Sequence, residues 1–113
     1  MANPSKDKGT RWENSVAQYF RDAGFTECFR MATAGENDAG DLGGIPDFAF
    51  ECRDRAKLSL AENVSDANNR ALNKGCDFGV AVMKKRNAPT ASGYVVCDLE
   101  TFTRLLQSFY VGR

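Results

Sequence analysis

The segment GDLGGIPDFAFECRD, residues 40–54, joins a turn signal to a clear strand pattern. Within it, residues 47–53 alternate in character with a period of two, as the two faces of a strand do. One face carries two phenylalanines and a cysteine, and the other carries Glu51 and Arg53. Carboxylates are rarely buried without a partner, so an acid on a strand that enters a core needs an explanation.

The turn GGIP places a second acid near the first. A hairpin centred on Pro46 sets Asp41 opposite Glu51, with Cβ atoms about 5 Å apart. Two carboxylates at this separation repel each other unless a cation lies between them, and oxygen ligands of this kind suit Mg²⁺ or Mn²⁺. The alternative is a solvated surface hairpin, in which Glu51 forms an exposed salt bridge with Arg53 or Arg55.

Composition sets limits on the function. The 113 residues are enough for one domain with a single core. The formal net charge is zero, so attraction to nucleic acid has to come from local clusters of basic residues. No apolar run is long enough to span a membrane, and the polar first residues lack the features of a secretory signal, so we expect a cytoplasmic protein.

Histidine is absent, and the four cysteines are widely spaced. This pattern argues against a zinc finger and against Ser-His-Asp or Cys-His catalysis in their usual forms. We therefore expect the cysteines to be free, buried thiols in a reducing compartment.

Hydrophobic periodicity predicts one α/β domain over residues 1–113. Residues 1–9 are expected to be flexible, and Thr10 with Glu13 predicts a capping box at the start of the first helix. A last helix is expected to start at Asp98 and to turn its apolar residues into the core, namely Leu99, Phe102, Leu105, Leu106 and Phe109. Between these helices we expect strands at 25–33, 47–53, 78–83 and 93–99, a loop or hairpin arm at 34–46, and a connecting helix at about 59–73. The elements predict a mixed sheet of about five strands flanked by helices.

Three blocks of the sequence resemble one family of nucleases. GDLGGIPDFAFECR resembles the Asp-x(n)-Glu-x-Lys signature of the restriction-endonuclease-like nucleases, the PD-(D/E)xK superfamily. KGTRWENSVAQYFRDAGF resembles the first helix of the Holliday junction resolvases in that superfamily. NRALNKGCDFGVAVMKKRN resembles the helix, strand and basic turn of small phage-encoded resolvases. The similarity extends over residues 8–106, and it implies the cytoplasm of a host cell if a phage encodes the chain.

The resemblance implies a restriction-endonuclease-like αβββαβ core and a Mg²⁺- or Mn²⁺-dependent endonuclease that cleaves four-way DNA junctions. The residues that it carries over are, as metal ligands, Asp41, Glu51 and the backbone carbonyl of Cys52, and, as further catalytic residues, Glu13 and Arg53. Arg53 departs from the family, whose signature has a lysine at this position. Arginine keeps the positive charge but cannot lose a proton to act as a base.

Basic residues cluster where they can meet the phosphates on either side of a cut. The run KKR follows a predicted buried strand directly, which fixes its place at the end of the sheet. The alternative is a solvated rim, which is the usual meaning of such a run. The residues that we expect to contact DNA are Lys8, Arg11, Arg55, Lys57, Lys84, Lys85 and Arg86.

The expected partners are branched DNA and a second copy of the chain. A four-way junction needs two symmetric cuts, which a twofold homodimer provides. Two alternatives stay open. The first is a nuclease of the same fold that acts on flaps, other branched DNA or RNA, and the second is a non-catalytic nucleic-acid-binding module in which Arg53 marks a decayed site.

Overall fold

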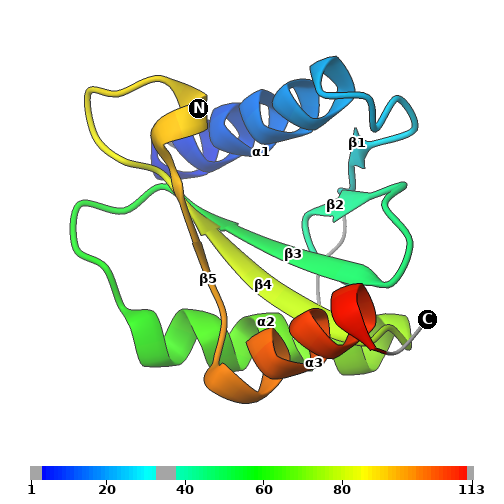
Figure 1. Ribbon diagram of the computed structural model, residues 1–113. Helices are drawn as coiled ribbons and strands as arrows, with labels where there is room; N and C mark the ends of the chain where they lie inside the picture. The colour runs from blue at the N-terminus through cyan, green and yellow to red at the C-terminus, as the bar shows by residue number, and fades with distance from the viewer. Residues whose placement is uncertain (1–3, 33–37, 112–113) are drawn as a thin grey trace.

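The computed structural model describes residues 4–32 and 38–111, which form a mixed five-stranded sheet between three helices (Figure 1). The elements follow in the order α1 (Pro4–Asp22), β1 (Phe29–Arg30), β2 (Leu42–Gly43), β3 (Phe48–Arg53), α2 (Leu60–Lys74), β4 (Phe78–Met83), the 3₁₀ helix η1 (Thr90–Ser92), β5 (Tyr94–Val96) and α3 (Leu99–Tyr110). Figure 1 shows α1 on one side of the sheet and α2 with α3 on the other. The predicted α/β class with a mixed sheet is confirmed.

The strands lie in the order of the chain, and only β3 and β4 are parallel. Helix α2 connects these two strands, as the sequence predicted for the helix at about 59–73. All six residues of β4 are buried, which fits its continuous apolar run. The carboxyl ends of β3 and β4 therefore lie together at one edge of the sheet.

The hairpin between β2 and β3 has the predicted register. Leu42 pairs with Phe50, so the centre of the pairing is Pro46, and Asp41 lies opposite Glu51. The turn depends on Gly44, which has a φ of +88°, and a Cβ there would overlap the carbonyl oxygen of Glu27.

The main core lies between α1 and the sheet. Phe50 and Cys52 from β3 pack with Trp12 and Val16 from α1. The indole N–H of Trp12 donates to the carbonyl oxygen of Val82 at 3.0 Å, which ties α1 to β4. This packing leaves Glu51 and Arg53 on the opposite face of β3, toward α2, as the period-two pattern predicted.

Helix α1 begins earlier than its sequence suggested. Residues 4–9, which we expected to be flexible, are helical, and residues 1–3 lie outside the described part of the chain. The capping box at Thr10 and Glu13 is therefore wrong, because both residues lie inside the helix. Proline at the first position explains the early start, since its fixed φ suits the first helical turn.

Two predicted strands are much shorter in the structure. The strand expected at 25–33 is reduced to β1, and the one expected at 93–99 is reduced to β5. Residues 33–37, part of the predicted loop or hairpin arm, lie outside the described residues. The described cysteines are free, but only Cys28 and Cys52 are fully buried.

Helix α3 starts at its predicted cap but does not bury its apolar face. The side chain of Asp98 accepts a hydrogen bond from the N–H of Thr101 at 2.8 Å. Thr101 is the buried residue of the helix, whereas Leu99, Phe102, Leu106 and Phe109 are exposed. The expectation that these four side chains face the core was wrong, because α3 turns Thr101 inward and the four apolar side chains outward. Arg104 of this helix donates a hydrogen bond to the carbonyl oxygen of Asp77 at 3.0 Å.

Among the described residues, none of the helices combines the length and the apolar character that a membrane crossing requires.

Candidate active site

Asp41, directly before β2, and Glu51, on β3, form the centre of the candidate site. Asp41 Oδ2 accepts a hydrogen bond from the backbone N–H of Cys52 at 2.6 Å. Burial, and after it the negative charge of Glu51, raises the pKa of Asp41 to about 8, against the opposing effect of the Cys52 N–H. Asp41 therefore stays protonated at neutral pH when no added cation lies beside it.

The guanidinium of Arg53 lies among the predicted metal ligands. Its Nη1 is 2.6 Å from Glu51 Oε1, 3.1 Å from the carbonyl oxygen of Cys52 and 3.9 Å from Asp41 Oδ2. The Glu51 side chain is only 3% exposed. The alternative of a solvated hairpin with an exposed salt bridge is thus wrong, because Glu51 is buried and Arg53 is only partly exposed.

Helix α2 adds two charged residues that sequence reasoning missed. Asp66 Oδ2 accepts a hydrogen bond from Nη2 of Arg53 at 3.1 Å, and Nε of Arg70 lies 3.0 Å from Glu51 Oε2. The atoms of the second pair lie close without the alignment of a hydrogen bond. The two residues are four apart and so share a helix face. Ala67, which follows Asp66 in the sequence, is buried, so this part of α2 lies against the sheet. Two charged residues four apart beside a buried alanine were the sequence signal that could have identified Asp66 and Arg70.

The donor atoms fit a divalent cation that prefers oxygen. Two carboxylates and one carbonyl converge on a single position, which is a set that Mg²⁺ or Mn²⁺ accepts when water completes the octahedron. In the described ranges, 4–32 and 38–111, no group of three or more acidic, cysteine or histidine side chains comes together. A cation at this position would therefore have two carboxylates, Asp41 and Glu51, and the Cys52 carbonyl as its protein ligands.

Glu13 lies beside this site rather than in it. Its Oε1 accepts a hydrogen bond from Nε of Arg30 at 2.7 Å. Glu13 and Arg53 both line one pocket of about 250 Å³, and Arg55 lines the same pocket. The catalytic role of Glu13 stays a prediction.

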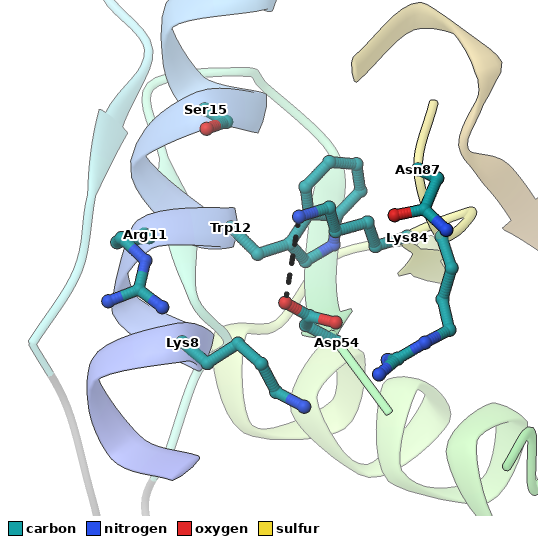
Figure 2. A pocket seen from close by; sticks show the side chains of 8 residues that line it. Lys8, Arg11, Trp12, Ser15, Asp54, Lys84 and Asn87 are labelled. Carbon is teal, nitrogen blue, oxygen red and sulfur yellow. Dashed lines mark ion pairs between the residues drawn. The ribbon is translucent and has the colours of Figure 1, made fainter. Parts of the chain in front are cut away.

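A second, more basic pocket lies between α1 and the turn after β4. Figure 2 shows Lys8 and Arg11 on one wall, Lys84 and Asn87 on the other, and Asp54 between them. The pocket has a volume of about 380 Å³, and it is lined by Lys8, Arg11, Trp12, Ser15, Asp54, Lys84, Arg86 and Asn87. Two basic clusters that are far apart in the sequence thus meet at one place.

Charge in this pocket is strongly unbalanced. Four cations surround one acid, and that acid, Asp54, is buried with Lys84 Nζ at 3.9 Å from Oδ2. Asp54 also lines the pocket of Glu13 and Arg53, so the two pockets adjoin at the end of β3. Lys85 and Lys57, which we also expected to contact DNA, are exposed and line neither pocket.

No family model matches the sequence, and no curated protein or solved structure is similar enough to it to indicate relatives. The resemblance to junction resolvases stays a prediction.

Proposed function

We propose that the chain is a metal-dependent endonuclease that hydrolyses phosphodiester bonds in branched DNA, with four-way junctions as the preferred substrate. The observation that carries the proposal is the convergence of Asp41, Glu51 and the Cys52 carbonyl on one cation position. The adjoining basic pocket supports it, because it offers a binding place for phosphate beside that position.

The residues divide the chemistry among them. Asp41, Glu51 and the Cys52 carbonyl hold Mg²⁺ or Mn²⁺, which supplies a Lewis acid for hydrolysis of the phosphodiester. Arg53 donates hydrogen bonds to the charge that grows on the phosphate, and it does not act as a base, because guanidinium stays protonated.

The basic pocket positions the DNA without reading its sequence. Lys8, Arg11, Lys84 and Arg86 surround a space large enough for a phosphate group and its sugar. Contacts of this kind fix the register of the backbone, while the shape of the junction selects the substrate. Two cuts on symmetric strands require two such sites, so the proposal includes a homodimer.

A second candidate function has one observation in its favour. The guanidinium of Arg53 already occupies the proposed cation position, which a working metal site does not require. That arrangement favours a decayed, nucleic-acid-binding module of the same fold.

One assay separates these functions. Purified protein is incubated with a four-way junction, a matched linear duplex, a flap and a single-stranded RNA, in Mg²⁺, Mn²⁺ or chelator. We expect nicking of the junction only when a metal is present, and loss of nicking but not of binding in Asp41→Asn and Glu51→Gln.

The control is Asp47→Asn, an equivalent change at an exposed acid in the same hairpin, which should cut almost normally. Arg53→Lys should keep or raise activity, because it retains the charge, and Arg53→Ala should cut about 100-fold more slowly. Cutting in chelator, or normal cutting by Asp41→Asn, contradicts the proposal. Metal-independent binding to the junction without cleavage favours the decayed module.

A further inference from the structure

We infer that Arg53 is the built-in cation of this site, and that a divalent ion binds to Asp41 and Glu51 only when the Arg53 guanidinium moves away. The inference deepens the proposed function and rests on it. The three oxygen atoms that contact Nη1 are those of the proposed ligand set, with separations from 2.6 to 3.9 Å. One nitrogen therefore lies at the point on which the ligands converge.

A guanidinium and a metal ion cannot hold this position together. A bound Mg²⁺ lies about 2 Å from its oxygen ligands, and Nη1 already lies 2.6 Å from Glu51 Oε1. Two cations on the same oxygen atoms repel each other, and the burial of Glu51 leaves little water to screen them. Binding of the ion and retention of Arg53 at Glu51 therefore exclude each other.

Asp66 gives the displaced guanidinium a second anchor. Nη2 of Arg53 bonds to Asp66 while Nη1 bonds to Glu51, so one side chain bridges the site and α2. Asp66 is 29% exposed at its side chain, against 3% for Glu51. If the Arg53 side chain rotates while its hydrogen bond to Asp66 stays intact, Nη1 moves toward solvent and Arg53 loses only its contact with Glu51. Glu51 keeps Arg70 at its other oxygen atom.

This arrangement makes metal affinity depend on residue 53 in a definite direction. The guanidinium competes for the position, so its removal strengthens metal binding even though it removes a residue of the proposed active site. Binding of the ion has to break the charged hydrogen bond from Arg53 to Glu51, and the loss of such a bond corresponds to a factor of roughly 10 to 150 in affinity. We expect Arg53→Gln to bind Mn²⁺ at least about tenfold more tightly than the parent.

The experiment is a titration with Mn²⁺ in which the free ion is measured by electron paramagnetic resonance, without DNA. Arg53→Gln is compared with the parent and with Arg104→Gln, the same change at a guanidinium of α3 that pairs with Glu100, and this control should leave the affinity unchanged. Arg53→Lys keeps the charge and so protects the fold. Its single nitrogen cannot hold Asp66 and Glu51 through separate atoms, so it should also bind Mn²⁺ more tightly.

The outcomes separate the inference from the proposed function. Equal Mn²⁺ affinity in the parent, Arg53→Gln and Arg53→Lys, with binding that still requires Asp41, overturns the inference and leaves the metal site in place. Absence of Asp41-dependent Mn²⁺ binding in every variant overturns both. Tighter binding in both variants at position 53, abolished by adding Asp41→Asn, supports the inference whether or not the protein cuts junctions.

A different observation carries a second inference. We infer that the exposed apolar face of α3 is the contact between two copies of this chain. The face is a continuous stripe at helical spacing, with side chains between 43% and 80% exposed, formed by Leu99, Phe102, Leu106, Phe109 and Tyr110. A soluble monomer rarely leaves such a stripe uncovered, and a 12-residue helix is only marginally stable without packing.

The area of the stripe matches what a homodimer needs. A standard interface buries about 800 Å² on each partner, of which roughly 65% in homodimers, about 500 Å², is apolar. An aromatic side chain presents about 150–250 Å², so the exposed parts of the three aromatic residues and two leucines amount to about 500 Å². The stripe carries no charge, so it has no electrostatic preference for an acidic or a basic partner. A twofold axis instead packs the stripe against itself.

Sedimentation equilibrium tests this contact, and Leu58 provides a matched control. Leu106 and Leu58 are both 43% exposed, but Leu58 precedes α2 and lies off the stripe. We expect a dimer for the parent and for Leu58→Asp, and a monomer for Leu106→Asp. Tyr110→Asp, at a more exposed position, should give a monomer as well, which guards against a folding defect of the first variant. A monomeric parent at about 100 μM, or dimers of both stripe variants, contradicts the inference.

Discussion

Asp41→Asn should gain stability relative to the parent as pH rises from 5 to 8, and the gain should level off above the pKa of Asp41. Burial and the charge of Glu51 raise the pKa of Asp41 to about 8, against 3.8 for the unperturbed carboxyl. Between these two values the folded chain holds a proton that the unfolded chain has released. Stability therefore falls as pH rises through this window, and asparagine removes the dependence because it stays neutral.

The size of the effect follows from the shift. One proton difference gives a slope of about 1.4 kcal/mol per pH unit, so the free energies of unfolding of variant and parent should diverge by on the order of 4 kcal/mol between pH 5 and 8. The amide oxygen of asparagine can still accept the Cys52 N–H, so the hairpin keeps that hydrogen bond.

Urea denaturation in chelator, repeated at pH 5, 6, 7 and 8, measures the divergence. Asp47→Asn is the control, because Asp47 is exposed at the turn and its replacement should leave a profile parallel to that of the parent. Parallel profiles for Asp41→Asn and the parent would mean that Asp41 titrates alike in the folded and unfolded chain, and that its burial does not raise its pKa.

Two further predictions concern the basic pocket and the hairpin turn. Replacing Lys84 and Arg86 with alanine should flatten the dependence of log junction affinity on log salt by about 2 units, since each phosphate contact contributes roughly 0.9, whereas Lys85→Ala, outside the pocket, should leave the slope unchanged. Equal slopes for the double variant and the parent would show that Lys84 and Arg86 lie on a solvated rim and do not contact phosphates. Gly44→Ala should lower the free energy of unfolding by more than about 2 kcal/mol in urea titrations, because of its positive φ and the overlap with the Glu27 carbonyl oxygen. A loss below about 0.5 kcal/mol would show that the hairpin tolerates a side chain there.

The hairpin at the centre of the site was predictable because its determinants are local. The alternation of residues 47–53 set which side chains share a face, and the turn around Pro46 set the partner of Glu51. The strand β4 was equally predictable, because an apolar run of six residues between a glycine-containing turn and a basic run has few other interpretations.

The charged partners of the site were not predictable, because they come from elements that meet only in the folded chain. Asp66 and Arg70 reach Arg53 and Glu51 through the placement of α2 across β3, which no local pattern specifies. The meeting of Lys8 with Lys84 has the same origin. Periodicity also identified the apolar stripe of α3 without revealing whether this chain covers it, because amphipathicity specifies a face and not its partner.

We propose that Asp41, Glu51 and the Cys52 carbonyl bind a divalent cation, and anomalous diffraction from crystals grown with Mn²⁺ locates such an ion without reference to activity. We predict one strong anomalous peak bonded to the carboxylates of Asp41 and Glu51, with Nη1 of Arg53 moved away from Glu51. Well-ordered crystals that show no peak at this position, with Nη1 still beside Glu51, would rule out the proposed metal site.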